Sequence, residues 1–352
     1  MNINRNKYQI RFFKVGEGAK GGDAILITLY DEKDNEHLIL IDGGYQKTGI
    51  AIIEYIKTHY KNHVIDYVFN THPDRDHISG LIEVLNSDEI EVKHLVYNRP
   101  WINASLNKGY FTDKRITSNS LLERIKQEFD LAVQLENIAI KKNIPIFSAM
   151  TCDRFCDVLY VLSPTTLHYQ QHLLLSDKTP LSILEKYNRP YLKKEYSEEI
   201  YDGTSVIEWY DDEVTSEINE TSVVLYLYLN STKFLFTGDA GKKSLEAALD
   251  STRNQLEVTH LQLPHHGSRK NINPDLICRI NASSYIISCP PDGEKEGHPS
   301  RRLMNKILEL NPDAKIYKTK DVNFIFHEGV EVKATTQFPQ SVNKYMDGKA
   351  IK

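Results

Sequence analysis

The densest group of chemically active side chains lies in the segment THPDRDHISG, where His72, Asp74, Asp76 and His77 fall within six residues. Imidazole and carboxylate groups at this spacing suit zinc or manganese, and they can be divided between two ions. In an extended segment, alternation sends His72, Asp74 and Asp76 to one side, and we expect the turn at His77 to bring a fourth ligand alongside. A solvated polar loop is the alternative, which an apolar strand before the segment and apolar residues after it disfavour.

Acidic or histidine residues also follow three other apolar runs that predict strands. These residues are Asp42, Asp239 and the pair His265 and His266. Each has an ordinary alternative explanation, namely a turn for Asp42, a helix cap for Asp239 and surface exposure for the two histidines. Because strand ends gather at one edge of a sheet, the four positions together predict one shared site.

The elements that must position these residues are predicted from the spacing of apolar side chains. Strands are expected over Tyr8–Val15, Ala24–Tyr30, His37–Ile41, Val64–Asn70, Val158–Leu162, Ser222–Leu229, Lys233–Phe236, Val258–Leu263 and Tyr285–Ser288. Helices are expected over Ile50–Tyr60, Gly80–Asn86, Leu121–Lys141, Lys243–Leu249, Pro274–Ile280 and Arg301–Asn311. The sequence changes character over 98–219, which we interpret as an insertion or cap, and 336–352 is expected to be a loose tail.

Composition excludes several classes of protein. The chain has 352 residues, of which 40% are hydrophobic and 26% are charged, so it is not disordered, fibrous or membrane-embedded. The longest apolar run, Val223–Leu229, falls far short of the roughly 20 residues that span a bilayer, and the first residues of the sequence contain no continuous apolar run of the kind found in signal peptides. We therefore expect a cytoplasmic protein with no membrane partner. Four cysteines are too few for a disulfide framework.

The net charge of -5 differs from the strongly basic balance of proteins that hold long nucleic acids. This weakens a nuclease interpretation without excluding it. The acidic excess belongs to one segment, Glu185–Glu217, which contains ten acidic and four basic residues. An acidic cap disfavours a long polyanionic substrate unless the cap lies away from the cleft.

The motif HPDRDH resembles the HxHxDH signature of the metallo-β-lactamase fold superfamily, with Asp74 in place of the second histidine. It is most similar to the soluble metallo-β-lactamase-like domain of the ComEC family of DNA-uptake channels, whose hallmark is HxDxDH. The matching segments follow the family order: VGEGAKGGDAILI (Val15–Ile27), LIDGG (Leu40–Gly44), THPDRDHISG (Thr71–Gly80), TSVVLYL (Thr221–Leu227), LFTGDAG (Leu235–Gly241), LPHHGS (Leu263–Ser268) and GHPS (Gly297–Ser300). The resemblance implies an α/β (α+β) fold, an αββα sandwich over 1–335 with a partly helical insertion in 98–219.

The resemblance also implies a site for two divalent metal ions, zinc or manganese. By position, His72 and Asp74 resemble ligands of one ion, and Asp76 and His77 resemble ligands of the other. Asp239 resembles the carboxylate that bridges both ions. His298 stands where the superfamily's last metal-binding histidine occurs. The catalytic candidates are Asp76, His265 and His266, the two histidines resembling those beside the scissile group, and Ser268 is a substrate-binding candidate.

One position departs from the family pattern. The histidine usually found before the strand that leads to Asp239 is absent, and Asn219 lies in this stretch. We expect Asn219 to be a weak ligand or to hold a water. Asp42 is expected to orient a ligand imidazole by a hydrogen bond, as carboxylates commonly do around metal-binding histidines.

The leading interpretation is a metal-dependent hydrolase, a phosphodiesterase or nuclease that attacks nucleic acid or nucleotides with a metal-activated hydroxide. An ester hydrolase acting on lactones or thioesters is an alternative, and an apolar pocket would favour it. A non-catalytic metal-binding module with a protein partner, contacted through 98–219, is another. The aromatic residues of that insertion have three candidate roles, which are base stacking, capping the site and packing: Tyr187, Tyr191, Tyr196, Tyr201, Trp209 and Tyr210.

Overall fold

The computed structural model describes most of the chain: residues 2–16, 20–103, 111–179, 209, 213–254, 256–290, 293, 297–319, 323–330, 344–346 and 349–351. Most of the expected tail at 336–352 lies outside these residues. So does most of the acidic segment Glu185–Glu217, including all of its tyrosines. Trp209 is described, and it packs against the outer hydrophobic cluster of the second sheet.

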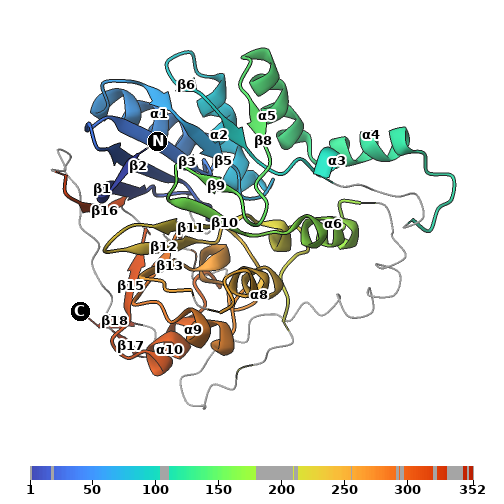
Figure 1. The fold of residues 1–352 in the computed structure, drawn as a ribbon. Coiled ribbons are helices and arrows are strands. Elements are labelled where there is room, and N and C mark those ends of the chain that lie inside the picture. The colour runs from blue at the N-terminus through green and yellow to red at the C-terminus, as the bar shows by residue number, and fades with distance from the viewer. Residues whose placement is uncertain are drawn as a thin grey trace.

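The first sheet has seven strands in the order β16-β1-β2-β3-β5-β7-β8 (Figure 1). Their bounds are β1 Ile3–Phe12, β2 Ile25–Asp31, β3 Glu36–Ile41, β5 Tyr67–Phe69, β7 Leu95–Val96, β8 Ile146–Phe147 and β16 Phe324–Glu328. The strands from β16 to β3 are antiparallel, and those from β3 to β8 are parallel. The β2–β3 turn is closed by the Asp31 carboxylate, which accepts hydrogen bonds from the backbone N–H groups of Lys33 and Asn35.

The second sheet also has seven strands, in the order β15-β14-β13-β12-β11-β10-β9. Their bounds are β9 Arg154–Phe155, β10 Leu159–Ser163, β11 Val224–Tyr228, β12 Lys233–Phe236, β13 His260–Gln262, β14 Ser284–Ile287 and β15 Lys315–Lys318. The strands from β12 to β15 are parallel. Two small ribbons pair β4 Val64–Ile65 with β6 Glu91–Val92, and β17 Lys344–Met346 with β18 Lys349–Ile351.

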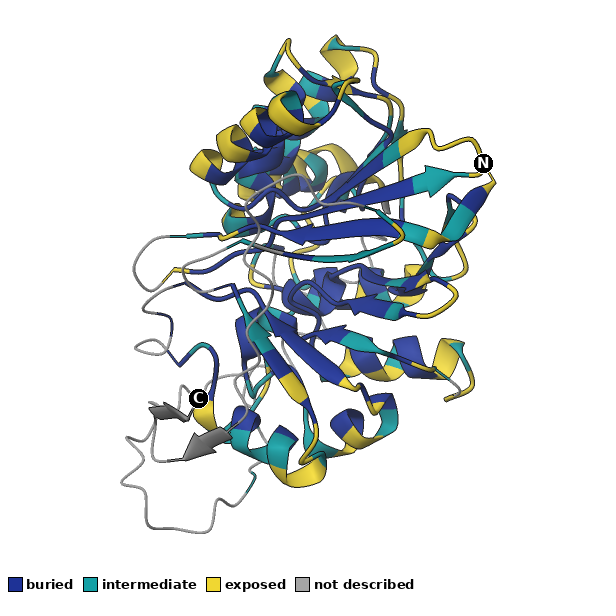
Figure 2. Cartoon of the chain, turned by 90° about the vertical axis from the view of Figure 1, so that its left-hand side faces the viewer, coloured by how far each residue is buried: buried dark blue, intermediate teal, exposed yellow. Residues whose placement is uncertain are grey.

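The sheets pack face to face, and alternation along the strands separates the layers. In β2, Ile25 and Ile27 point to the core between the sheets, whereas Leu26 points to the helices outside. Leu225 and Phe234 of the second sheet fill the same inner core. Buried residues therefore follow both sheets, while exposed residues lie mainly on the outer helices (Figure 2).

Helices cover both outer faces, which confirms the predicted αββα sandwich (Figure 1). Over the first sheet lie α1 Gln46–His59, α2 Arg75–Asn86 and α5 Asp130–Lys141. Over the second sheet lie α8 Lys242–Ser251, α9 Pro274–Ile280 and α10 Arg301–Leu310. The other helices are α3 Pro100–Asn103, α4 Ser118–Glu128 and α6 Thr166–Leu175, with short 3₁₀ turns η2 Asn219–Thr221 and η3 Pro264–Gly267. No helix in the described ranges combines the length and apolar character needed to cross a membrane.

Glycines allow α1 and α2 to approach closely. A Cβ atom added to Gly80 of α2 would lie 1.9 Å from the carbonyl oxygen of Gly43, and one added to Gly49 of α1 would lie 2.4 Å from the carbonyl oxygen of Gly80. Because real Cβ atoms do not approach backbone this closely, only glycine fits at these contacts. The contact fixes the start of α2, which carries Asp76 and His77.

Two predicted helix boundaries are wrong. The helix expected from Gly80 already begins at Arg75, so Asp76 lies in its first turn rather than in an extended segment, and the turn expected at His77 is this helical turn. The helix expected over Leu121–Lys141 is two helices, because Phe129 leaves helical geometry (φ -118°, ψ 48°) and is buried in the core.

The range 98–219 contributes to the body of the sandwich as well as to its helices. Within it, β8 extends the first sheet, and β9 and β10 extend the second. α5 packs beside α2 on the first sheet. All four cysteines are free thiols, with Cys156 and Cys289 buried.

Candidate metal centre

The predicted site residues converge where neighbouring parallel strands end. Asp42 follows β3, and His72 comes shortly after β5, the parallel neighbour of β3. On the second sheet, Asp239 comes shortly after β12, and His265 follows β13, the parallel neighbour of β12. The four strand ends are brought together, so the residues form one site between the two sheets.

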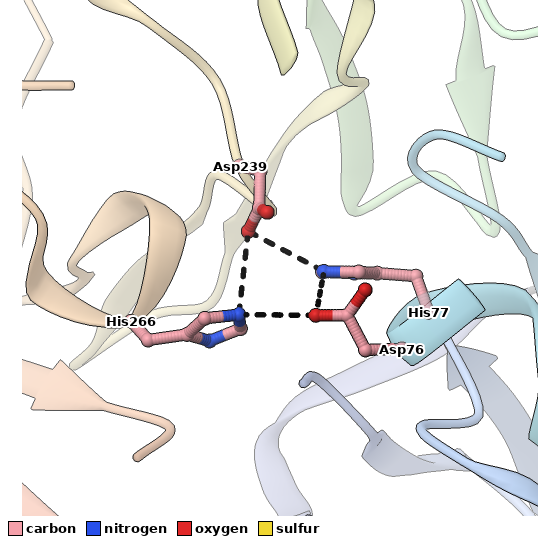
Figure 3. Close-up of side chains that lie close together, drawn as sticks. All are labelled: Asp76, His77, Asp239 and His266. Atoms are coloured by element: carbon pink, nitrogen blue, oxygen red, sulfur yellow. Dashed lines mark ion pairs between the residues drawn. The ribbon is translucent and has the colours of Figure 1, made fainter. Parts of the chain in front are cut away.

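One cluster contains Asp76, His77, Asp239 and His266, whose potential ligand atoms all lie within 4.8 Å of one another (Figure 3). His77 Nε2 lies 3.4 Å from Asp239 Oδ1 and 3.7 Å from Asp76 Oδ2. His266 Nε2 lies 3.4 Å from Asp76 Oδ2 and 3.9 Å from Asp239 Oδ1. Two carboxylate oxygens and two imidazole nitrogens thus face a common point.

A second group meets the other oxygen of the same aspartate. Asp239 Oδ2 lies 3.6 Å from His72 Nε2 and 3.7 Å from His265 Nε2. His72 Nε2 also lies 3.6 Å from Asp74 Oδ2. Asp239, which is 3% exposed, therefore has one oxygen facing each group.

Asp42 determines which nitrogen of His77 carries the proton. Its carboxylate accepts hydrogen bonds from Asn70 Nδ2 at 3.1 Å, Thr71 N at 2.8 Å and Thr71 Oγ1 at 2.6 Å. His77 Nδ1 lies 2.8 Å from Asp42 Oδ2 and donates the fourth hydrogen bond. The Nε2 lone pair of a neutral His77 therefore points at Asp239 and Asp76.

Two further histidines are held in the same tautomer. The Thr71 hydroxyl donates its proton to Asp42, so at 3.2 Å it accepts a hydrogen bond from His72 Nδ1. The Asn271 amide donates to the carbonyl oxygens of Asp239 and Ala240, which leaves its Oδ1 to accept from His265 Nδ1 at 3.2 Å. In both histidines Nε2 is the unprotonated nitrogen and faces a carboxylate.

These arrangements fit a bound cation. A lone pair that faces a carboxylate oxygen is repelled by it unless positive charge lies between them. Four buried ligand atoms of the two groups have no hydrogen-bond partner among the described residues: Nε2 of His72, His77 and His266, and Oδ1 of Asp239. The donor set of imidazole nitrogens and carboxylate oxygens suits a divalent ion such as zinc or manganese.

The electrostatics of the cluster also favour positive charge. Burial lowers the pKa of His266, but the carboxylates of Asp239 and Asp76 outweigh it and raise that pKa to about 9. Burial is likewise outweighed at His77, whose pKa is raised well above its ordinary value by Asp239, Asp42 and Asp76. Burial raises the pKa of Asp76, but His77 and His266 lower it to about 2. Because ligands must be deprotonated, metal binding here is expected to release protons from the histidines.

Unusual backbone conformations direct several of these side chains. His265 and His266 have φ angles of 48° and 57°, and Gly267 continues the turn at 86°. Consecutive left-handed residues are costly outside glycine, and they cluster at functional sites. This turn directs both histidines at Asp239. Asp42 also has a positive φ, 54°.

The remaining candidates lie near the centre without joining the cluster. Asn219 Nδ2 contacts Thr215 Oγ1 at 2.9 Å and His265 Nδ1 at 3.4 Å, so it touches a histidine of the centre. The His298 ring centroid lies 4.9 Å from that of His265, and burial with the neighbouring His265 and His266 lowers the pKa of His298 to about 3. Ser268 is buried directly after the histidine turn.

Three residues of the site were not singled out from the sequence. Thr71 and Asn271 set the tautomers of His72 and His265. Asp23 is 1% exposed, lies 3.9 Å from His77 Nδ1 and forms a second acidic group with Asp42. Burial raises the pKa of Asp23, and His266 and His77 oppose that shift. The sequence signal for Asp23 is an acid directly before the apolar strand that starts at Ala24.

A family model described as the Metallo-beta-lactamase superfamily matches residues 18–289. No curated protein sequence matches the chain. The fold is similar to that of Igni18, a metallo hydrolase from the archaeon Ignicoccus hospitalis, with 10% identity, a TM-score of 0.44 and coverage of 90% of this chain and 98% of that one.

Two other solved structures are similar at low identity. The long form of RNase Z from yeast is 14% identical, with a TM-score of 0.38, and the match covers 81% of this chain and 37% of that one. A mutant of CmlA beta-hydroxylase is 8% identical, with a TM-score of 0.45 and coverage of 91% and 54%. The chain thus spans little more than a third of the length of the RNase Z that it matches.

Proposed function

Because the chain belongs to the metallo-β-lactamase superfamily, we propose that it is a metal-dependent phosphodiesterase that acts on nucleic acid or nucleotides at a centre for two divalent ions. The superfamily is generally hydrolytic and uses divalent metal ions. The proposal adds that the hydrolysed bond is a phosphodiester and that the centre holds two ions. The observation that carries the proposal is the position of Asp239, whose two oxygens face two separate groups of imidazole and carboxylate ligands.

In the proposal, His72, Asp74 and His265 hold one ion, and Asp76, His77 and His266 hold the other. Asp239 is shared between them. When bound there, divalent ions would supply a water-derived nucleophile at neutral pH and would stabilise the charge that develops on a phosphoryl group. His265 takes the place of the absent third-motif histidine, which leaves Asn219 beside His265 without a ligand role.

The roles of the remaining residues follow from their contacts. The resemblance assigns the last ligand to His298, whereas the donor geometry favours His266 for that role. His298 is then a neutral imidazole beside the centre, available for contact with the substrate together with Ser268. Asp42, Thr71 and Asn271 orient the ligand imidazoles through hydrogen bonds to Nδ1, which directs each Nε2 towards the ion site.

The substrate and the subfamily are proposed from the ligand types. Asp74 stands where most superfamily motifs carry histidine, and the added carboxylate makes the site harder and more favourable to manganese than an all-histidine site. The HxDxDH pattern supports membership of the ComEC-like group, and with it a nucleic-acid substrate. We keep 1–335 as one domain, with the helical part of 98–219 as the candidate surface for a protein partner.

The test is hydrolysis of bis(p-nitrophenyl) phosphate by metal-stripped protein after addition of Mn²⁺ or Zn²⁺. Wild type should turn over only with metal, and Asp239→Ala should lose that turnover. Asp88→Ala removes a carboxylate that is 97% exposed and should behave as wild type. Absence of turnover in protein that binds the metal would contradict the phosphodiesterase assignment and favour a lactone or thioester hydrolase, or a non-catalytic metal module.

A further inference from the structure

A large cavity lies beside the metal centre on the helical side of the first sheet. Its volume is about 800 Å³, and its walls are formed by residues of α1, α2 and α5 together with Lys14, Gly16 and Lys20. Four cationic side chains line it: Lys14, Lys20, Lys47 and Arg75. We call this cavity the basic pocket.

The charge of the basic pocket contrasts with that of the whole chain. All four cationic residues are exposed. Glu83 is the only acidic residue among the described residues that line the pocket, and its carboxylate accepts a hydrogen bond from Gln46 Nε2 at 2.9 Å. A chain with a net charge of -5 thus places four cationic side chains around this one cavity.

The start of α1 adds to the positive potential of the pocket. Lys47 lies in the first turn of this 14-residue helix, which has no acidic residue in that turn and no side-chain cap. The positive end of the helix dipole is therefore not offset locally by a carboxylate. This end of α1 and the four cations together favour an anion.

The basic pocket adjoins the metal centre through two connections. Arg75 lies between Asp74 and Asp76 in the chain, at the first residue of α2. Lys20 precedes Gly21, where an added Cβ would lie 3.2 Å from the His266 ring. Residues that line the basic pocket are therefore direct chain neighbours of residues at the metal centre.

The lining of the pocket also includes apolar side chains. These are Ala51 of α1, Ile82 of α2 and Leu131 of α5, together with Tyr45. A ligand with both phosphates and flat apolar groups matches this combination. An unstacked nucleotide base presents such a group, whereas a duplex keeps its bases stacked inside.

We propose that the basic pocket binds the phosphodiester backbone and an unstacked base of single-stranded nucleic acid, next to the bond that is cleaved at the metal centre. This inference rests on the proposed function and extends it, because it names the form of the substrate. It also explains how a net-negative chain holds a polyanion: the contact is confined to one pocket rather than spread over a basic surface.

The test measures binding without catalysis. A fluorescein-labelled single-stranded octanucleotide is titrated with the full-length chain in the presence of a chelator, and fluorescence anisotropy is followed at several salt concentrations. The variant Lys14→Gln/Lys47→Gln should bind at least about tenfold more weakly, and its log-log salt slope should fall by about 1.4, at about 0.7 per lost phosphate contact on a single strand. Binding to wild type should strengthen from dinucleotide to octanucleotide.

The matched control is Lys33→Gln/Lys61→Gln. It removes the same charge from exposed lysines in the β2–β3 turn and just after the end of α1, away from the pocket. Equal loss of binding in both double variants, no length dependence, or tighter binding of a duplex would overturn the inference. Bis(p-nitrophenyl) phosphate hydrolysis is scored separately, so failure of the pocket and failure of the phosphodiesterase assignment give different results.

Discussion

His77 Nδ1 lies 2.8 Å from Asp42 Oδ2, and both side chains are fully buried. Asp42 already accepts three hydrogen bonds from Asn70 and Thr71, so it stays an acceptor towards His77. The pair therefore holds the Nε2 lone pair of His77 towards Asp239 and Asp76. The ligand geometry on one side of the centre depends on this contact.

Replacing Asp42 should weaken metal binding without removing a ligand. In Asp42→Asn, one of the two carboxylate oxygens that accept hydrogen bonds is replaced by an amide NH₂ group. That donor would face the donors of Thr71 or His77. We expect 10- to 100-fold weaker binding, the usual effect of losing such an orienting partner. Competition with a chromophoric chelator measures it. The control is Asp66→Asn. Asp66 is another buried aspartate, which accepts a hydrogen bond from Leu38 N away from the site, so this variant should keep the metal affinity of wild type. Equal affinities of wild type and Asp42→Asn would contradict the role given to Asp42.

Asn271 should matter for stability as well as for the orientation of His265. Asn271→Asp keeps the shape but removes the donors to the carbonyl oxygens of Asp239 and Ala240. Buried acceptors without partners cost about 1–3 kcal/mol each, so we expect the free energy of unfolding to fall by about 2 kcal/mol or more. Urea denaturation measures the change. The exposed Asn137→Asp in α5 is the control, and similar stability of the two variants would be evidence against this network.

Gly80→Ala should be destabilising, although it lies inside a helix. Alanine normally stabilises a helix relative to glycine by about 1 kcal/mol. Here the added Cβ would lie 1.9 Å from the carbonyl oxygen of Gly43, in the turn before α1, and 3.0 Å from Gly49 N of α1, so α2 must move away from both. We expect a loss of about 2–3 kcal/mol, measured by thermal unfolding of metal-free protein. An unchanged or higher Tm would show that the two helices are not held at this distance.

His260 should make the protein sensitive to mild acid. It is stacked on Phe234 and packs at a tilt against Phe326, and burial, with Lys315 nearby, lowers its pKa from 6.5 to about 4. Between these pH values the unfolded chain binds a proton at His260 that the folded chain does not. The free energy of unfolding should therefore fall as the pH drops from about 6.5 to about 4, by at most about 3 kcal/mol. Denaturation of wild type and His260→Gln across this range measures the effect. The variant should show the shallower dependence, and parallel curves would rule His260 out as the cause.

The fold could be predicted largely from periodicity and from the family resemblance. Buried strands such as β12 and β13 are short apolar runs with clear turns after them, so their ends, and the acidic or histidine residues there, are visible in the sequence. The break at Phe129 could not be predicted, because the apolar pattern continues through it. The early start of α2 at Arg75 was missed because its first turn is made of polar residues.

The metal-centre candidates were visible as residue types, but their arrangement was not. The left-handed φ angles of His265 and His266 leave no mark on the sequence pattern, yet they direct both rings towards Asp239. Thr71 and Asn271 are held by hydrogen bonds to Asp42 and Asp239, which are far from them in the sequence, and such partners are specified only by tertiary contacts. Likewise, the cationic residues of the basic pocket come from separate segments of the chain, so the net charge of the sequence does not reveal that they lie together.

The most direct test of the account is anomalous diffraction from crystals of the full chain grown with Mn²⁺ or Zn²⁺. The account predicts two ions, one within about 2.0–2.2 Å of donor atoms of His72, Asp74 and His265, and the other within the same distance of donors from Asp76, His77 and His266. Both should contact Asp239. A single ion, or ions bound away from Asp239, would contradict the shared two-ion centre.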